Sequence, residues 1–393
     1  MIDKVLILKS DLNLLVLPIG SLPSWVQSIF ERFGELNGVA DDAMKGDVDA
    51  LQKLKLIRDE SGVSVVFLGL DEDGFDDKFI TCGNSLSKDF KVLSIGLDED
   101  TKIDGKVKDE VDGNGFYTDS SVFEYKGYKG RPIFAVEVTN NTKLDQFLTN
   151  LSTPQNEVTV APSVLDLLKL KNNEASLFSY SKMYLDWLMK NQFCPGCGSK
   201  VAPIDAGTKL LCTSNPKEVD CPVKRTKVNN VCFPRTDPVT IIAVLSQDGK
   251  KILLGHNKRH RKEFGSKMFT TVAGFMEPGE TIEESTTREI WEETGCKVSR
   301  IKIMKSQPWP FPACLMIGCF GYVEFNGVNE KINLELDKEL DECRWFDVED
   351  IRKLAFGESI EGLEMVQDIT LPFSGSIAFE LIKAAVAPEK SRL

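Results

Sequence analysis

The residues of this chain best suited to chemistry are three glutamates within one short segment. Glu289, Glu292 and Glu293 stand at positions i, i+3 and i+4, so a helix would place their carboxylates on one face. At ~5 Å and an effective dielectric of ~20, two such charges repel by roughly 3 kcal/mol. A bound divalent cation turns that cost into a binding site, and hard oxygen ligands suit Mg²⁺ or Mn²⁺. We therefore predict a metal centre on this helix.

The helix that must carry these carboxylates has signals at both ends. Thr281 followed three residues later by Glu284 forms the pattern of a capping box, which predicts the start of a helix. Gly295 occupies the position where a glycine commonly ends one. We expect the three glutamates to lie in the second half of this helix.

A loop precedes the helix and is expected to approach the ligand. Gly274 and Gly279 allow it to turn tightly and to pass close to a bound group. Arg288 can reach back from the helix to a loop carboxylate, for which Glu280 is the best candidate. This contact would hold the loop to the helix.

Residues 274–296 together follow the pattern G-x5-E-x7-R-E-U-x-E-E-x-G-U, where U is apolar. A solvated acidic helix is the simpler alternative, but seven identities at fixed offsets arise by chance on the order of once in a hundred thousand chains. The pattern resembles the Nudix box, with every polar position present. The resemblance implies hydrolysis of a nucleoside diphosphate linked to another moiety, with metal-bound water attacking phosphorus.

A second informative segment, SQPWPFPACLMIG, covers residues 306–318. Its prolines alternate with Trp309 and Phe311, which predicts a rigid, extended loop. Aromatic side chains on such a loop suit a flat heterocycle, because stacking on a base is worth ~1–3 kcal/mol. A proline-rich surface segment of the SH3-ligand type is the alternative. The apolar run 315–323 favours a loop at the mouth of a core strand instead.

Four cysteines between residues 190 and 232 have the spacing of a zinc ribbon. Cys194 and Cys197 form a C-x2-C knuckle, and Cys212 and Cys221 follow it. Thiolates in two pairs on a short segment are typical of structural zinc, which contributes folding energy to a piece too small to stabilise itself. Cys232 competes with Cys221 as fourth ligand; we favour Cys221 because Asp220 and Pro222 place it in a turn. Four unrelated core cysteines are the alternative.

The ribbon, an F-P-R-x-D-P entry at 233–238, the box and SQPWPFP are arranged as in the NADH pyrophosphatase family, which this chain resembles over roughly 185–385. The resemblance implies hydrolysis of NAD(H) to AMP and nicotinamide mononucleotide. Removal of NAD caps from RNA 5′ ends would use the same site. An inactive nucleotide-binding or interaction module is the alternative from another class.

The resemblance also implies roles for individual residues. Arg288 and the three box glutamates would be catalytic, and the metal would be held by these glutamates, Glu339 and the carbonyl of Ala273. Two residues depart from the family pattern: Phe233 replaces the usual tyrosine, and Cys314 replaces the usual serine. The implied substrate-binding residues are Phe233, Phe275, Gln307, Pro308, Trp309, Pro310, Phe311, Pro312, Ala313, Cys314 and Ala378.

The composition limits the remaining possibilities. The chain has 393 residues, a formal net charge of −12 and 42% hydrophobic residues. This favours two or three packed domains and argues against a dedicated surface for nucleic acid or anionic membranes. Ten cysteines, four of them clustered, fit a reducing compartment better than a disulfide framework. We expect no signal peptide and no membrane span, hence a soluble protein.

We expect a multidomain α+β protein with four parts. Residues 1–185 would form an α+β domain with a scaffolding or dimerisation role in a homodimer. Its strands are predicted at 5–10, 12–20, 63–70 and 132–139, its helices at 24–34 and 162–192, and its acidic loops at 71–77 and 98–115 do not fit an EF-hand. The zinc ribbon would cover 186–232, an α/β/α sandwich with a mixed sheet 233–385, and a tail 386–393. In the sandwich, a strand is predicted at 268–275, directly before the box.

Two further segments carry weaker signals. The basic stretch 258–264 could meet phosphates, although an exposed hairpin loop is the better interpretation. The chain ends in Ser391-Arg392-Leu393, a variant of the S-K-L peroxisomal address. We therefore expect a peroxisomal location if the organism is a eukaryote, and a cytoplasmic one otherwise.

Overall fold

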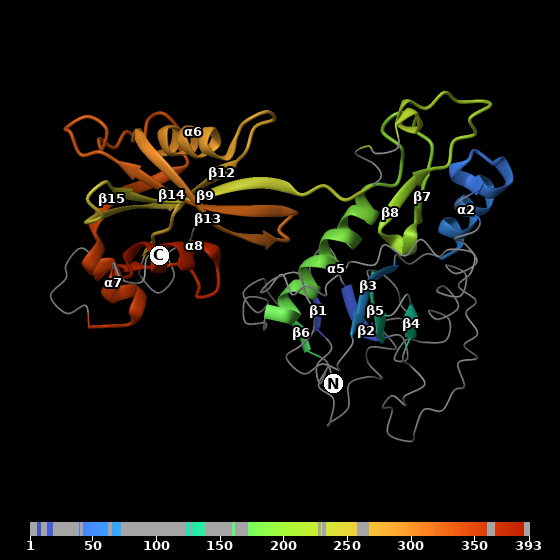
Figure 1. The fold of residues 1–393 in the computed structure, drawn as a ribbon, viewed down its shortest axis with the longest axis horizontal. Helices are drawn as coiled ribbons and strands as arrows, with labels where there is room; N and C mark the ends of the chain where they lie inside the picture. Colours follow the sequence, from blue (N-terminus) through green and yellow to red (C-terminus); the bar gives the residue numbers. More distant parts are fainter. Residues whose placement is uncertain are drawn as a thin grey trace, which may run out of the picture. The chain divides into compact units, whose positions relative to one another are not determined.

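The computed structural model divides the chain into two units, Met1–Arg235 and Thr236–Leu393, which are described separately (Figure 1). The predicted boundary between ribbon and catalytic domain lay three residues earlier, and the ribbon shares a unit with the N-terminal region. The structure describes residues 6–8, 14–18, 39, 42–61, 65–71, 123–125, 128–137, 159–161, 172–226, 229, 233–257, 267–359 and 366–388.

In the first unit, a strand is found at each position where one was predicted, and three of these strands form an antiparallel sheet. Its order is β2 (Leu14–Pro18), β5 (Tyr128–Glu137) and β3 (Val65–Asp71), and β4 (Phe123–Tyr125) also pairs with β5. The predicted strand 5–10 is present as β1 (Leu6–Leu8), which pairs in parallel with the unpredicted β6 (Thr159–Ala161). The predicted helix 24–34 and the acidic loops lie outside the described residues, apart from Asp71 at the end of β3.

Among the described residues of the first unit are two helices, and one of them packs on the zinc ribbon. The long helix α5 (Asn172–Lys190) lies within the predicted range 162–192. The ribbon itself is a hairpin of β7 (Val201–Ile204) and β8 (Lys209–Cys212) with two 3-10 turns at Asp205–Gly207 and Pro222–Arg225. Helix α2 (Val48–Ser61) buries Leu51 and Leu54 against Ala202 and Ile204 of β7. The ribbon therefore shares its apolar core with a distant part of the chain.

The second unit is built on a six-stranded mixed sheet. Its order is β13-β14-β9-β10-β15, and β12 also pairs with β9. The pair β14 and β9 is parallel, and the other neighbours are antiparallel. The bounds are β9 Asp237–Ser246, β10 Lys251–Asn257, β12 Val272–Phe275, β13 Val298–Trp309, β14 Cys314–Val323 and β15 Leu340–Asp347.

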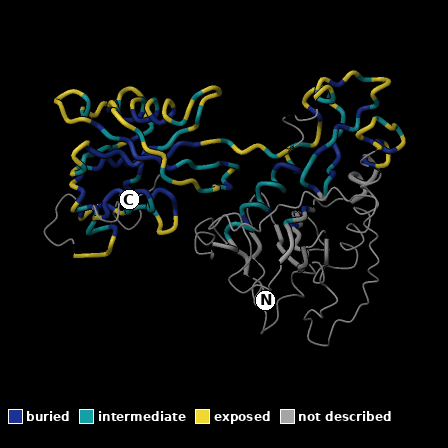
Figure 2. Tube along the Cα trace, in the orientation of Figure 1, coloured by how far each residue is buried: buried dark blue, intermediate teal, exposed yellow. Residues whose placement is uncertain are grey.

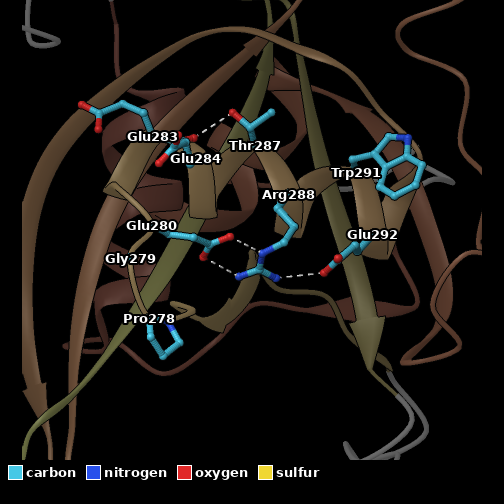
Figure 3. Close-up of a pocket in the computed structure, with 9 residues that line it drawn as sticks. All are labelled: Pro278, Gly279, Glu280, Glu283, Glu284, Thr287, Arg288, Trp291 and Glu292. Carbon is cyan, nitrogen blue, oxygen red and sulfur yellow. Dashed lines mark hydrogen bonds and ion pairs between the residues drawn. The ribbon is translucent and has the colours of Figure 1, made fainter.

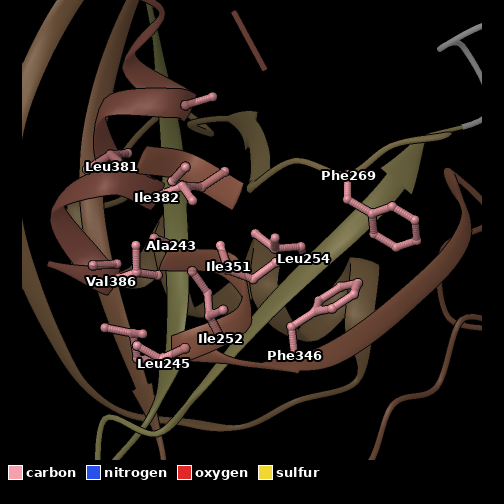
Figure 4. Close-up of a cluster of buried hydrophobic side chains, with 14 of the residues drawn as sticks. Ala243, Leu245, Ile252, Leu254, Phe269, Phe346, Ile351, Leu381, Ile382 and Val386 are labelled. Carbon is pink, nitrogen blue, oxygen red and sulfur yellow. The ribbon is translucent and has the colours of Figure 1, made fainter. Parts of the chain in front are cut away.

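Helices cover both faces of this sheet, as predicted for an α/β/α sandwich. Figure 1 shows α6 (Ile282–Thr294) on one face and α7 (Val348–Phe356) and α8 (Ile377–Val386) on the other. Buried residues follow the central strands (Figure 2). Ile290 of α6 packs with Ile242 and Val244 on one face. On the other, Leu381 and Ile382 of α8 join the cluster around Phe269 and Phe346 (Figure 4).

The predictions for individual strands need two corrections. The predicted strand 268–275 is divided into β11 (Lys267–Met268), which pairs with β16 (Ile369–Thr370), and β12. The predicted extended loop was wrong for residues 306–309, because β13 continues through Trp309 and pairs with β14. Proline removes a backbone donor, but β13 lies at the edge of the sheet, where a strand tolerates proline.

The helices of the described residues show no membrane span. None of them is both long enough and apolar enough to cross a bilayer.

Candidate active site

Helix α6 begins and ends at the residues that the sequence indicates. The side chain of Thr281 accepts a hydrogen bond from the Glu284 N–H, and the Glu284 carboxylate accepts one from the Thr281 N–H, which completes the capping box. Gly295 ends the helix with φ of 76°, a left-handed conformation that favours glycine. The helix is therefore fixed at both ends, and so are the carboxylates on it.

Arg288 holds the preceding loop to the helix, as predicted. Its Nε donates to Glu280 Oε1 at 2.6 Å and its Nη2 to Glu280 Oε2 at 2.9 Å (Figure 3). Nη2 also donates to the carbonyl of Phe275 at 2.8 Å. Glu280 in turn accepts a bond from the Glu277 N–H. Bonds from Arg288 lower the pKa of Glu280 to about 2, so this carboxylate is charged at neutral pH.

The third nitrogen of Arg288 is directed at the box carboxylates. Nη1 donates to Glu289 Oε1 at 2.7 Å and to Glu292 Oε2 at 2.9 Å. Arg288 therefore lies between three glutamates and neutralises part of their charge. Their oxygen atoms surround the guanidinium and do not converge on one point; among the described residues, only the four ribbon cysteines gather their ligand atoms within 4.8 Å.

Glu289 rests against the backbone of Gly274. A β-carbon built on Gly274 would lie 1.9 Å from the carboxyl carbon of Glu289. No side chain can occupy that space, so the absence of one at residue 274 lets strand β12 and helix α6 approach each other. The sequence indicated a tight turn at this glycine, but the contact with Glu289 was not foreseen.

Glu293 is the most deeply buried carboxylate of the site. Its residue is 5% exposed, and burial raises its pKa to about 8, with further increases from the negative charges of Glu289 and Glu339. The N–H of Ala273 donates to it and opposes this shift. Glu339, which precedes β15, is close enough for its charge to raise the pKa of Glu293; its role as a metal ligand stays a prediction. A buried carboxylate among like charges fits a divalent cation held by oxygen ligands.

The outer side of α6 borders a depression of about 850 Å³. Arg288 and Glu292 reach into it from the helix, and Pro278 closes its lower side (Figure 3). Three further carboxylates of the loop and helix line it, so its character is acidic. The lining residues are Pro278, Gly279, Glu280, Glu283, Glu284, Thr287, Arg288, Trp291 and Glu292.

The predicted substrate residues differ in their exposure. Phe275 is 56% exposed at the end of β12, so its ring is available for stacking. Trp309 and Phe311 face each other edge to face, with ring centroids 5.8 Å apart, at the turn between β13 and β14. Ala378 is buried in the first turn of α8. Phe233 belongs to the first unit, where the Lys209 amine lies 5.9 Å from its ring centroid.

Two residues of the SQPWPFP segment have surroundings that the sequence did not reveal. Cys314 is 4% exposed, and burial raises the pKa of its thiol. A buried, protonated thiol is a weak hydrogen-bond donor, which makes this departure from the family pattern substantial. The amide of Gln307 contacts the backbone at the start of α8, at Gly375 and Ile377. These partners are 68 and 70 residues away, and no local signal indicates them.

The four predicted zinc ligands gather at one point in the first unit. The sulfur atoms of Cys194 and Cys221 are 3.6 Å apart, and those of Cys197 and Cys212 are 3.5 Å apart. Four sulfurs at ~2.3 Å from a tetrahedral zinc ion would be ~3.8 Å apart, so the cluster has the dimensions of a closed structural site. Cys221 lies in this cluster, as expected for the preferred fourth ligand; its rival Cys232 lies outside the described residues, so the choice between them stays a prediction.

Comparisons with known proteins agree with this geometry. Residues 235–366 match the NUDIX domain, and residues 190–218 match the NADH pyrophosphatase zinc ribbon domain. The residues matched by the ribbon family end before Cys221, which the structure places in the cysteine cluster.

Several curated relatives match a large part of the chain. The NAD-capped RNA hydrolase NPY1 of Saccharomyces cerevisiae is 47% identical over 276 residues, which is 67% of this chain and 69% of that protein. The NAD-capped RNA hydrolase of Schizosaccharomyces pombe is 35% identical over 64% of each chain. The human NAD-capped RNA hydrolase NUDT12 is 38% identical over 56% of this chain and 44% of its own length. The chain belongs to the Nudix hydrolases, in the NADH pyrophosphatase family that carries a zinc ribbon.

Proposed function

We propose that this protein is a metal-dependent diphosphatase that hydrolyses NAD(H) to AMP and nicotinamide mononucleotide. The observation that carries the proposal is the placement of Glu293, buried and close to the charges of Glu289 and Glu339. Such a group is costly without a cation and is suited to holding one beside a diphosphate. The complete Nudix box and the matching ribbon support the same activity.

The reaction joins the oxygen of a water molecule to one phosphorus of the diphosphate and breaks the bond from that phosphorus to the bridging oxygen. When bound, Mg²⁺ or Mn²⁺ would lower the pKa of the attacking water and neutralise phosphate charge. Glu289, Glu292, Glu293 and Glu339 would hold the ion. Arg288 holds the loop and the glutamates in place through its hydrogen bonds to Glu280 and to the box carboxylates. The exposed ring of Phe275 is placed to stack on a base.

Removal of NAD caps from RNA 5′ ends is a second candidate activity. It breaks the same diphosphate bond, and three relatives with 35–47% identity bear the name NAD-capped RNA hydrolase. The net charge of −12 disfavours long RNA contacts, but a short 5′ end needs few of them. Specificity constants for NADH, NAD⁺ and a short NAD-capped RNA, measured side by side with each metal, would rank the substrates.

The test of the enzyme hypothesis is the double variant Glu292→Gln, Glu293→Gln. It keeps the volume of both side chains and removes their charges, so NADH turnover with Mg²⁺ or Mn²⁺ should fall at least about a hundredfold. Glu324→Gln is the control. It changes an exposed residue directly after β14 and should keep wild-type activity. Unchanged turnover in the double variant would show that these carboxylates do not carry the reaction, and no turnover in the wild type would favour an inactive nucleotide-binding module.

We also propose a peroxisomal location, based on Ser391-Arg392-Leu393, which lies outside the described residues. A fluorescent protein fused in front of this tail should form puncta, and one residue added after Leu393 should disperse them. Diffuse signal from the intact tail would contradict the proposal.

A homodimer is the oligomeric state that we propose. Light scattering coupled to gel filtration should give twice the chain mass of 43.8 kDa. A monomer at micromolar concentration would contradict it.

A further inference from the structure

Gln307 connects two elements that the sequence places far apart. Its side chain extends from β13, where Nε2 donates to the carbonyl of Gly375 at 2.9 Å, and Oε1 accepts from the N–H of Ile377 at 2.8 Å. The amide thus uses one donor and its acceptor on the backbone at the start of α8. The acceptor bond satisfies an N–H that a helix leaves without an internal partner.

Ser376 makes the complementary contacts from within the turn. Its hydroxyl accepts from the N–H of Phe379, and both its N–H and its hydroxyl donate to the carbonyl of Phe373. Ser376 therefore shapes the turn internally, whereas Gln307 fixes the turn to the neighbouring strand.

The two caps leave one N–H of the first helical turn available. Ile377 donates to Gln307 and Phe379 donates to Ser376, and no described residue accepts from the N–H of Ala378 between them. The position of this donor is thus set on one side by Gln307 and on the other by Ser376.

Packing beneath the turn makes the connection rigid. A β-carbon on Gly318 of β14 would lie 3.0 Å from Cδ1 of Ile377, so α8 rests directly on the strand. An exposed ion pair between Lys305 and Glu380, at 3.4 Å, joins the same two elements. The pair is solvent-exposed and should contribute little. Gln307, whose partners are backbone atoms with fixed positions, provides the directional constraint.

We propose that Gln307 is a positioning residue, which fixes the turn carrying Phe373 and Ala378 against the Trp309–Phe311 hairpin. It thereby sets the geometry of the dinucleotide pocket that the family resemblance implies at these residues, which is not the depression beside α6. This rests on the proposed function. Phe373 is 44% exposed on that turn, and the hairpin carries its own aromatic pair. Base stacking depends on the separation of such surfaces, and a displacement of ~1 Å can cost up to a hundredfold in rate.

The experiment compares Gln307→Ala and Gln307→Glu with Lys305→Gln in the full-length, zinc-loaded protein. Amide hydrogen exchange at Ile377, measured without substrate, reports the two hydrogen bonds of Gln307, which we call the clamp. The values of kcat and KM for NADH with Mg²⁺ report the pocket. In Gln307→Ala, the Ile377 amide should exchange roughly fivefold faster. The value of kcat/KM should fall about tenfold or more, mainly through KM, because the metal ligands on α6 are not touched. Lys305→Gln should match the wild type in both measurements.

The glutamate variant separates the two hydrogen bonds. It keeps the acceptor for Ile377, so exchange there should stay slow, but it places an oxygen opposite the Gly375 carbonyl, so KM should lie between those of the wild type and Gln307→Ala. It also carries the test if Gln307→Ala does not fold.

Three outcomes would overturn the proposal. Wild-type exchange at Ile377 in Gln307→Ala would show that Gln307 does not hold α8. Faster exchange with unchanged KM would show that the clamp does not shape the pocket. Wild-type protein without NADH turnover would refute the proposed function and the pocket role with it, while the exchange data would still decide whether the clamp exists.

Discussion

Arg288 and Glu280 form a bidentate pair, with donor–acceptor distances of 2.6 and 2.9 Å, that holds the loop of the Nudix box to its helix. Lysine is a point charge and cannot reproduce two parallel bonds. Arg288→Lys should therefore lower kcat for NADH roughly tenfold to a hundredfold by releasing the loop and the box glutamates. Steady-state kinetics with saturating Mg²⁺ would measure the change.

Arg352→Lys is the matched control. Arg352 on α7 makes the same type of pair with Glu349, at 2.9 and 2.6 Å, away from the box. Both variants lose a bidentate bond, but only the Arg288 change should reduce kcat. Equal activities in the two variants would contradict a positioning role for Arg288.

The pair of Arg288 and Glu280 also predicts how the stability of the protein depends on pH. Bonds from Arg288, and after them the Glu277 N–H, lower the pKa of Glu280 from 4.5 to about 2. A carboxylate with a lowered folded-state pKa stabilises the protein above its unfolded pKa, and that stabilisation is lost as pH falls. The free energy of unfolding should therefore decrease between about pH 4.5 and 2, and Glu280→Gln should make this decrease shallower. Urea titrations across that range would test it; identical slopes would argue against the pair.

Close approach at Gly274 gives a third prediction. A methyl group there would overlap the Glu289 carboxylate, whose carbon lies 1.9 Å from the ideal β-carbon position. Gly274→Ala should displace Glu289 and weaken Mn²⁺ binding about tenfold or more, as measured by calorimetry with the full-length protein. Gly274→Ala combined with Glu289→Asp, which shortens the side chain, should recover part of the lost affinity. Wild-type affinity in the single variant would show that Glu289 does not need this position.

Local sequence patterns were sufficient for the features whose partners are close in the chain. The capping box of Thr281 and Glu284 spans three residues, and the Arg288–Glu280 pair spans eight. Partners that are three or eight residues apart come within side-chain reach once the helix and its preceding loop form, so spacing was sufficient to predict these contacts. The cysteine cluster followed for a similar reason, because a tetrahedral ion accepts few arrangements of four thiolates.

Contacts between distant segments could not be predicted in this way. The edge position of β13 depends on the order of the whole sheet, and only that order allows Pro308 within a strand. Gln307 was predicted as a pocket residue only through the family resemblance; its observed partners are backbone atoms of Gly375 and Ile377, at the start of α8. Helix α2 carries no signal that it packs on the ribbon strand β7. Each of these follows from tertiary packing and not from local pattern.

The shared core of α2 and the ribbon leads to the last prediction. Four cysteines hold the ribbon, and Leu51 and Leu54 of α2 pack on its strand β7, so zinc should stabilise both segments. Cys221→Ser should lower bound zinc from about one ion per chain to well below one and should speed hydrogen exchange in β7 and in α2. Cys232→Ser tests the rival ligand and should keep both the zinc content and the exchange rates of the wild type. Loss of zinc in Cys232→Ser, with retention in Cys221→Ser, would reverse the ligand assignment. Faster exchange in β7 alone would show that α2 is stabilised independently of the metal.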